Sequence, residues 1–429
     1  VLEYGKKETV DLAFTEDDLY NESRSKVIVA ADDAEPGAVF GFEAAVERRP
    51  LFGQVEWYFQ DSRPTLLSRF ELRLPDGWRA NSITMNHESI EPEIQKTEYS
   101  WSLRNLPPIP DEPLSPPLTY MVPRLLVSIS APESNAACLG FSSWSEVSAW
   151  LTNLNDPQVL ESETLVAAAR ELANDLPDQL SKIRAIGAYV QKLSYVSVQI
   201  GLGRGGGYRP RPAREVFANS YGDCKDKVNL MRTMLRVIGI QSLPVAVYSG
   251  DPNYVFEGWP SPAQFNHYII GIQLDENAEC ACDSIVKPSG FGRLLIFDPT
   301  EDDVPLGILP RHQQGGLGLL VAGKEGALIR LPLTNPEDNR TERSIEATLS
   351  DTGDLNAEVI ERTFGRPAVS ERKLHRGASR GEYRDLIERW IVRGAPGATV
   401  ADLESEDDYN LNQFALRVKL TAPRYGQSM

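Results

Sequence analysis

Three residues whose types suit acyl transfer follow one another along the chain, namely Cys224, His267 and Asp298. Asp223 is a good helix N-cap and Gly222 allows a sharp turn before it, so Cys224 is expected in the first turn of a helix. A thiol at that position faces the positive end of the helix dipole, which favours the thiolate over the thiol. Cys224 is therefore a candidate nucleophile that needs a base.

The surrounding sequence predicts the elements that carry these three residues. Apolar residues recur at three- and four-residue spacing after the cysteine, so one helix face is expected to be buried: Val228, Met231, Leu235 and Ile238. Gly239 is placed to end this helix. Residues 264–274 are typical of a strand with His267 near its start, and residues 293–298 form a short apolar strand that ends at Asp298. A cysteine acyl-transfer site needs a thiolate, an imidazole that accepts and returns its proton, and a carboxylate that orients the ring.

Three short blocks around these residues resemble those of the bacterial transglutaminase-like superfamily: YGDCKDK at 221–227, FNH at 265–267 and FDPT at 297–300. The resemblance is to its multidomain bacterial branch, in which a β-sandwich domain of unassigned function precedes a papain-like cysteine core. It implies that Cys224 is the nucleophile, His267 the base and Asp298 the orienting acid. The blocks are specific for the fold and the triad but not for the reaction, because the superfamily includes cross-linking enzymes, peptidases, amidases and inactive members.

An acyl-transfer site also needs donors for the oxyanion of its intermediate. The backbone N–H of Cys224 points out of the helix N-terminus and is expected to be one donor. The resemblance implies a second donor upstream, for which Gln199 and Tyr195 are the candidates; the alternative is that both are ordinary strand residues. Lys225 either steadies the thiolate or is one of the solvated charges that commonly flank a first helical turn. The glycine-rich residues 203–207 lack the Lys-Ser/Thr of a phosphate-binding loop, and the resemblance places them beside the substrate groove.

Composition limits the remaining possibilities. The chain has 429 residues, 41% hydrophobic and 24% charged, so it is expected to fold as a globular protein of two or three domains. With 44 basic and 61 acidic residues, its net charge of −17 argues against a nucleic-acid or anionic-membrane partner. No apolar run approaches the roughly 20 residues of a membrane span. We predict no metal or organic cofactor, because the four histidines lack ligand spacing and no EF-hand-type calcium loop is present.

The pattern along the chain predicts an α+β multidomain fold. Short alternating strands with turn signals fill residues 1–133, which we assign to a β-sandwich domain. Residues 134–328 hold helical patterns and the three blocks, and form the transglutaminase-like core, with helices packed on an antiparallel sheet. Residues 329–429 contain a hairpin, a helical stretch and two more strands, and form a C-terminal β-rich domain. The chain starts at Val1 and stops at Met429 soon after a strand, so we expect it to be truncated at both ends.

Two features of the first domain have alternative interpretations. The aromatic residues Trp57, Tyr58 and Trp101 form either a ligand platform or part of the sandwich packing, and packing is favoured. The proline-rich residues 105–123 are expected to lie as an extended strap on the sandwich.

The cysteine count leaves the redox compartment open. If Cys224 is the free nucleophile, Cys138, Cys280 and Cys282 remain, which is an odd number. The Cys280-Ala-Cys282 spacing is expected to be too tight for an easy mutual disulfide, and a bridge from Cys138 to either of them stays open.

The function predicted from the sequence is cysteine-dependent acyl transfer on amide bonds of a peptide or protein, through a thioester that water or an amine resolves. The first alternative is a catalytically silent peptide-binding or scaffold protein that keeps the fold. A second is a dedicated peptidase acting on cell-wall or other bacterial peptides. The predicted partner is a peptide or protein substrate and the predicted location is extracytoplasmic, periplasmic or secreted, in a bacterium; the oligomeric state is left open.

Overall fold

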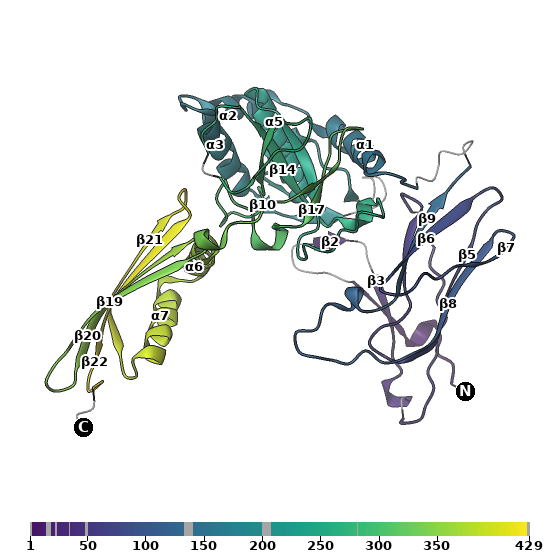
Figure 1. Ribbon diagram of the computed structural model, residues 1–429, viewed down its shortest axis with the longest axis horizontal. Helices are drawn as coiled ribbons and strands as arrows, with labels where there is room; N and C mark the ends of the chain where they lie inside the picture. Colours follow the sequence, from purple (N-terminus) through teal and green to yellow (C-terminus); the bar gives the residue numbers. More distant parts are fainter. Residues whose placement is uncertain are drawn as a thin grey trace.

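The computed structural model of the chain has three consecutive parts, and the middle part lies between the other two (Figure 1). The N- and C-terminal parts are rich in β-strands, whereas the middle part contains a sheet and five of the seven α-helices found in the described residues. The predicted α+β multidomain fold is confirmed, while the domain boundaries at residues 133 and 328 stay a prediction. The structure describes residues 2–13, 19–21, 24–33, 35–47, 50–132, 140–199, 207–280 and 282–426.

The N-terminal part is a sandwich of two three-stranded antiparallel sheets. One sheet has the order β4 (Gln54–Tyr58), β9 (Arg124–Ser130), β6 (Arg79–Met85). The other has the order β5 (Thr65–Arg73), β8 (Glu98–Leu106), β7 (Glu93–Gln95). Before the sandwich, β1 (Thr9–Ala13) pairs with β3 (Arg24–Ile28), and β2 (Leu19–Asn21) pairs in parallel with β11 (Ser197–Gln199) of the middle part.

Aromatic side chains fill the space between the two sheets. Trp101 is fully buried, and its ring centroid lies 5.6 Å from that of Phe70. Its indole N–H donates to the Ser82 hydroxyl at 3.2 Å, and the Trp57 indole N–H donates to Ser68 at 3.3 Å. For Trp57 and Trp101 the structure therefore supports packing rather than a ligand platform.

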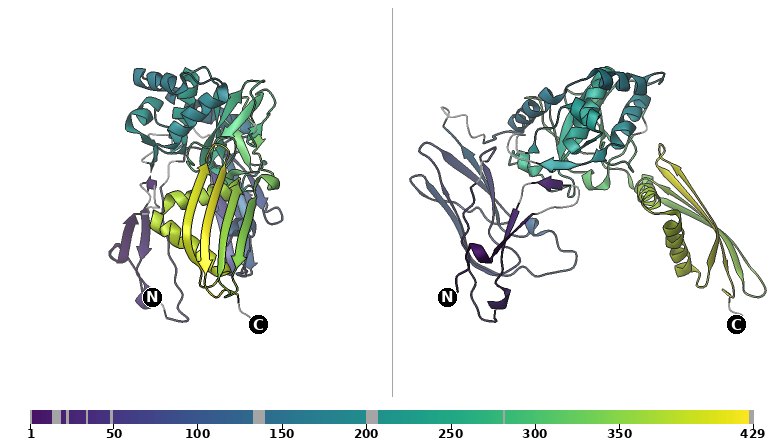
Figure 2. Two further views of the ribbon diagram at one scale, coloured as in Figure 1. Left: turned by 90° about the vertical axis from the view of Figure 1, so that its left-hand side faces the viewer. Right: turned by 180° about the vertical axis from the view of Figure 1, so that it is seen from behind.

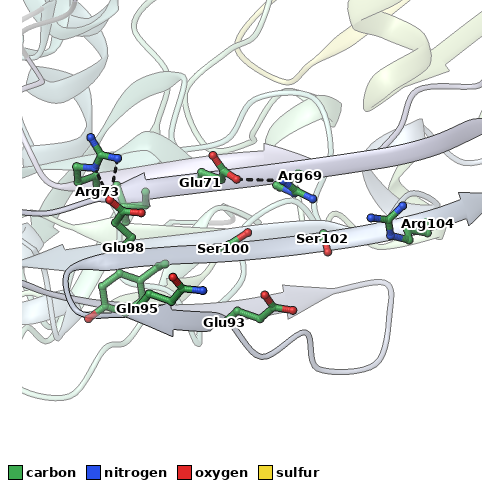
Figure 3. A pocket seen from close by; sticks show the side chains of 11 residues that line it. Arg69, Glu71, Arg73, Glu93, Gln95, Glu98, Ser100, Ser102 and Arg104 are labelled. Atoms are coloured by element: carbon green, nitrogen blue, oxygen red, sulfur yellow. Dashed lines mark hydrogen bonds and ion pairs between the residues drawn. The ribbon is translucent and has the colours of Figure 1, made fainter.

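The outer face of the β5-β8-β7 sheet carries a hollow lined by charged side chains (Figure 3). Three arginines and three glutamates lie there: Arg69, Arg73, Arg104, Glu71, Glu93 and Glu98. Arg73 pairs with Glu98 at 2.7 Å and Arg69 with Glu71 at 3.3 Å, all with exposed side chains. Exposed ion pairs contribute about 0–1 kcal/mol each. Since the two signs balance, the hollow offers no net field to a charged ligand.

The middle part is built on a six-stranded antiparallel sheet with helices packed on it. The strand order is β15 (Ile285–Val286), β16 (Arg293–Phe297), β14 (His267–Leu274), β13 (Ser242–Val247), β17 (Leu317–Leu320), β18 (Leu328–Arg330). The helices are α1 (Trp144–Asn155), α2 (Glu163–Ala173), α3 (Gln179–Gln191), α4 (Ala213–Asn219) and α5 (Cys224–Val237). Helix α5 packs on β14 and β13 and also contacts α2, α3 and α4. Two short strands, β10 (Ser194–Tyr195) and β12 (Tyr221–Gly222), pair in parallel. Strand β12 directly precedes the N-cap of α5 in the chain.

Helix α5 begins and ends where the sequence predicts. Asp223 is its N-cap and accepts a hydrogen bond from the backbone of Asp226, whose side chain accepts one from the backbone of Asp223. At the other end Gly239 has a φ of +82°, which suits a glycine after a helix. The predicted apolar face is buried at Val228, Met231 and Leu235, and polar positions such as Asn229 and Thr233 are buried as well. The helix is surrounded by the sheet and by three other helices.

Gly222 is required by a close approach rather than by its backbone angle. A Cβ at this position would lie 2.6 Å from the Cβ of Asp226 and 3.2 Å from the Val216 side chain. We expect Gly222→Ala to lower the free energy of unfolding by about 1–3 kcal/mol, as overpacking does elsewhere. Urea unfolding measures the change. Gly377→Ala is the matched control, because no atom lies within 4 Å of its added Cβ; equal losses in the two variants would contradict the prediction.

The C-terminal part is a four-stranded antiparallel sheet with two helices on one face (Figure 2). The strand order is β19 (Thr341–Leu349), β20 (Leu355–Phe364), β22 (Gln413–Ala422), β21 (Thr399–Asp408). Helices α6 (Arg366–Gly377) and α7 (Arg380–Gly394) replace the single helical stretch expected from the sequence. They are separated because Ser379 caps α7, its hydroxyl accepting from the backbone of Glu382.

Helix α6 ties the C-terminal part to the loop that follows β16. The Arg372 guanidinium is fully buried, pairs with Asp407 at 2.8 Å, and donates to the backbone oxygen of Asp303 at 2.9 Å. One turn later, Arg376 pairs with the Asp303 carboxylate at 3.3 Å. A buried arginine without partners would be costly, so these bonds fix the two parts against each other.

The turn between β21 and β22 reaches the same loop. The Tyr409 hydroxyl lies 3.0 Å from the backbone oxygen of Val304 and 3.2 Å from Oε1 of Gln191 in α3. The Gln191 amide in turn donates to the backbone oxygens of Glu301 at 2.7 Å and Val304 at 2.9 Å. Residues 301–304 are therefore held from α3 and from the C-terminal part together. This loop begins three residues after Asp298.

Among the described residues, no helix combines the length and the apolar character that crossing a membrane requires.

Candidate active site

Cys224, His267 and Asp298 meet because three elements are neighbours in the middle part. Cys224 is the first residue of α5, and α5 lies against β14. His267 is the first residue of β14. Strand β16 pairs with β14, with Phe297 opposite Ile270, so Asp298 emerges beside the start of β14. Residues far apart in the sequence are thus brought to one end of the sheet.

The three side chains lie next to one another, and a hydrogen bond joins two of them. Nε2 of His267 lies 2.9 Å from Oδ2 of Asp298. The neighbouring Cys224 side chain is one of the causes that raise the pKa of His267. Because Nε2 is occupied by the carboxylate, Nδ1 is the ring nitrogen left to face the sulfur. The structure brings the three predicted residues together in the predicted order.

Asp298 is almost completely buried and its carboxylate is fully hydrogen-bonded. Oδ1 accepts from the backbone N–H of Thr300 at 2.8 Å and from its hydroxyl at 2.7 Å. Oδ2 accepts from the Gln313 amide at 2.5 Å in addition to His267. Burial raises the pKa of Asp298, but the charge and hydrogen bond of His267, with Gln313 and Thr300, bring it down to about 2. The group is therefore ionised and held in one orientation.

The imidazole of His267 is held in its charged form. Burial lowers the pKa of His267, but the Asp298 charge and hydrogen bond, followed by those of Cys224, raise it well above 6.5. An imidazolium between a carboxylate and a thiol is the arrangement that stabilises a thiolate. The charged imidazole of His267 therefore lies beside the Cys224 side chain.

Of the two predicted upstream oxyanion donors, the structure places Tyr195 at the cysteine. Tyr195 lies opposite Gly222, two residues before Cys224, in the β10-β12 pair, and its phenol is near enough to the cysteine for Cys224 to influence its pKa. Burial raises the pKa of Tyr195, and the nearby charges of Cys224 and Asp223 raise it further, so the hydroxyl keeps its proton. The backbone of Gln199 pairs with Asn21, while its side chain and residues 200–206 lie outside the described residues.

Two lysines close to the cysteine are buried. Lys225 forms an ion pair with Asp223 and lines the pocket beside Cys224. Burial lowers its pKa, but the charges of Asp223, Cys224 and Asp226 raise it above its ordinary value, so Lys225 stays charged. Lys227 donates to the backbone oxygen of Leu193 at 3.0 Å, just before β10. Lys225 is therefore buried and paired with Asp223, and it is not one of the solvated charges that commonly flank a first helical turn.

A pocket of about 310 Å³ opens beside Cys224 and His267. Apart from these two residues, most of its wall is apolar or aromatic: Leu151, Tyr208, Ala246, Pro262, Phe265 and Tyr268. Phe52 of the N-terminal part supports the wall, since its ring lies 6.0 Å from that of Tyr208. This volume is at the lower end of the range of about 300–1,000 Å³ found for small-ligand sites.

The cysteines other than Cys224 are not at the site, as far as the structure describes them. Cys280 and Cys282 form a disulfide with their Cα atoms 5.1 Å apart, so the prediction that they are too close to pair is wrong. One intervening residue already gives a Cα separation within the usual disulfide range. Cys138 lies outside the described residues. Within the described ranges, no three His, Cys, Asp or Glu side chains gather as metal ligands.

Sequence reasoning missed Gln313, which lies in the short helical turn Arg311–Gln313 and donates to Asp298. No spacing signal connects a glutamine in a short helical turn with an aspartate that follows a strand 15 residues earlier. A buried amide that completes a carboxylate's hydrogen bonds is visible only in the folded chain.

Comparison with known proteins matches two regions of the chain. Residues 2–110 match the domain of unknown function DUF3857, and residues 166–275 match the transglutaminase-like superfamily. No curated protein matches the chain. The second region contains Cys224 and His267, while Asp298 lies beyond its end.

Several solved structures are similar at low sequence identity. A putative protease from Parabacteroides distasonis is 14% identical with a TM-score of 0.46, over 88% of this chain and 70% of that one. A putative cysteine protease from Cytophaga hutchinsonii is 12% identical with a TM-score of 0.26, over 65% and 83%. The transglutaminase of red sea bream is 13% identical with a TM-score of 0.23, over 71% and 68%. The two family models alone identify residues 166–275 as a transglutaminase-like core that follows a DUF3857 domain at residues 2–110.

Proposed function

We propose that the protein is a cysteine-dependent acyl-transfer enzyme that acts on amide bonds of a peptide or protein. The observation that carries the proposal is the juxtaposition of Cys224, His267 and Asp298, in which the pKa of the imidazole is raised well above 6.5. The superfamily match over residues 166–275 supports a cysteine enzyme in general. The pocket beside the sulfur supports access for a substrate.

In the proposed first step the Cys224 thiolate attacks the carbonyl carbon, so that a C–S bond forms and the carbonyl oxygen becomes an oxyanion. The backbone N–H of Cys224 and the Tyr195 hydroxyl are the proposed donors to that oxygen, because the hydroxyl lies against this end of α5. The imidazolium of His267 then gives its proton to the leaving amine as the C–N bond breaks, leaving a thioester. Asp298 keeps the ring in place during the transfer.

In the proposed second step a water molecule or an amine attacks the thioester. Neutral His267 takes the proton from the attacking group as the new C–O or C–N bond forms. The C–S bond then breaks and the thiolate leaves, paired again with the imidazolium. Water gives hydrolysis, as in a peptidase or amidase, and an amine gives transfer.

The test is acylation by p-nitrophenyl acetate, an activated ester that needs no peptide-binding site. We expect a burst of one p-nitrophenol per chain and one acetyl group on the peptide that contains Cys224, found by mass spectrometry. Cys138→Ala should keep the burst. Adding glycine methyl ester as the amine decides the second step, because transfer yields the N-acetyl amide and hydrolysis yields only acetate.

The silent-scaffold alternative predicts a different outcome. It predicts no burst and no acetyl group on Cys224. It also predicts that iodoacetamide at mildly acidic pH alkylates Cys224 no faster than it alkylates glutathione. Both results together would overturn the proposed function.

A further inference from the structure

The pocket beside the cysteine also indicates which substrate residue can supply the carbonyl that Cys224 attacks. The residue that supplies the carbonyl becomes bonded to the sulfur, so its side chain is the substrate group held closest to Cys224. The pocket wall that this side chain meets comes from the loop residues Pro262 and Phe265, from Leu151 of α1 and from Ala246 of β13. All four are apolar.

Among the described residues that line this pocket, the basic side chains of Lys225 and His267 already have a partner of opposite sign. The Lys225 ammonium is paired with Asp223. Behind it, Asp226 lies 3.8 Å from Arg211. The charge of His267 is balanced by Asp298 at 2.9 Å. A carboxylate or ammonium group entering the pocket would therefore lose water without gaining an unpaired counter-charge, which is unfavourable.

An amide side chain would also find few partners there. The side chain of Asn266, at the rim, is already used, because it accepts from the backbone of Ser249 at 2.6 Å and donates back to it at 3.1 Å. The Tyr268 hydroxyl is buried and has no hydrogen-bond partner within the described residues, so it could satisfy only part of an amide group. Glutamine has two amide donors and an acceptor to satisfy, more than the phenol hydroxyls of the wall can pair.

From these contacts we infer that the pocket selects acyl donors whose scissile carbonyl belongs to an uncharged apolar or aromatic residue, such as phenylalanine or leucine, over glutamine, glutamate or lysine. The inference rests on the proposed function, since it needs Cys224 as the attacking group. The volume of about 310 Å³ suits one such residue with its carbonyl.

The test uses acetyl-aminoacyl chloromethyl ketones of phenylalanine, leucine, glutamine, glutamate and lysine on the full chain. These probes alkylate Cys224 irreversibly and place their side chain on the acyl side, and mass spectrometry gives the rate. Each rate is divided by the iodoacetamide rate, which does not depend on the pocket. We expect the phenylalanine and leucine probes to react about 10–100-fold faster than the glutamate and lysine probes, and faster than the glutamine probe.

Variants of Phe265 in the pocket wall test whether the pocket causes the preference for apolar acyl residues. Phe265→Leu keeps an apolar wall and is expected to keep the preference of leucine over glutamate while lowering the rate with the phenylalanine probe relative to leucine. Phe265→Ala should reduce both preferences. Phe291→Ala is the matched control, because Phe291 packs against the hydrophobic cluster on the opposite face of the sheet, and it should leave the preferences unchanged.

The outcomes separate this inference from the proposed function. Fast iodoacetamide labelling with equal rates for all five probes, or with the glutamine probe fastest, would overturn the pocket preference alone. Labelling of Cys224 at the glutathione rate by iodoacetamide, together with the absence of a p-nitrophenol burst, would overturn the proposed function and the inference with it.

Discussion

Replacing Cys224 by alanine is expected to lower the rate of p-nitrophenyl acetate turnover by about 10⁴–10⁶-fold. The sulfur is the only group at the start of α5 that can carry the acyl group, since the neighbouring Lys225 is held charged by Asp223. Stopped-flow measurement of p-nitrophenol release checks the result. The burst should vanish rather than slow down, because no thioester can form.

The fold should survive this change. Cys224 is only partly buried, so loss of its sulfur is expected to leave the melting temperature close to that of the parent chain. Circular dichroism and thermal unfolding provide this control. Cys138→Ala keeps the burst if Cys224 is the acylated residue. A Cys224→Ala protein that folds and still shows a burst would contradict the assignment.

Replacing Asp298 by asparagine is expected to have the second largest effect, a fall in kcat/KM of about 10³–10⁴-fold. Asparagine can keep the hydrogen bonds from Thr300, but it cannot balance the imidazolium of His267. It can also present its amide N–H to the ring, which favours the wrong tautomer. The same ester assay measures the loss.

The pH profile gives a second readout for this variant. The folded-state pKa of His267 is raised, so the imidazolium and its pairing are present below that pKa and are lost as the pH rises through it. In the parent chain the alkaline limb of kcat/KM should therefore lie well above pH 6.5. Removing the Asp298 charge removes the strongest cause of the raised pKa, so the limb should move to lower pH.

An exposed carboxylate provides the matched control. Asp275 follows the far end of β14 and is exposed, so Asp275→Asn should change neither the rate nor the position of the limb. If the alkaline limb of kcat/KM does not shift in Asp298→Asn, a group other than His267 sets its position. A large loss of rate in the control would point to a general effect of removing negative charge.

Local signals in the sequence were enough to place the core of the site. The helix that carries Cys224 is bounded by a cap at Asp223 and by Gly239, both of which act within a few residues. His267 and Asp298 lie at the ends of strong apolar strands, whose pairing brings them to the same end of the sheet. Helix start, strands and order along the chain, together with the resemblance of the three blocks to the transglutaminase-like superfamily, predicted that these residues lie together.

Strand β13 is not among the strands expected from the sequence, and it contains a proline. Pro244 lies within a strand that is central in the sheet, where proline is normally disfavoured. It stands next to the last pair of the β13–β17 ladder, Val245 with Leu320, so only the hydrogen bond at the end of that ladder lacks its donor. The Pro244 carbonyl still accepts from Val321 at 2.9 Å. Such an exception depends on where the neighbouring strand stops, which the local sequence does not contain.

Long-range polar contacts were likewise outside the reach of sequence patterns. The amide of Gln313 completes the hydrogen bonding of Asp298, and the Arg372–Asp407 pair joins two parts of the chain. Neither has a characteristic spacing, because each forms only when distant elements pack. The disulfide of Cys280 and Cys282 was misjudged for a different reason, since the separation of their Cα atoms depends on the backbone path between them.

Because Arg372 and Tyr409 of the C-terminal part bind the loop that follows β16, we expect that the middle part cannot be separated from the C-terminal part without a loss of activity. Asp298 directly follows β16. The next loop is held by the C-terminal part through the backbone oxygens of Asp303 and Val304. A fragment that ends after residue 330 would lack the hydrogen bonds from Arg372 and Tyr409 to this loop. Asp298, which precedes the loop, would then be held less firmly, and so would the His267 ring that it binds. Changes far from the substrate, in α6 or in the β21–β22 turn, can therefore tune turnover without altering any side chain that the substrate touches.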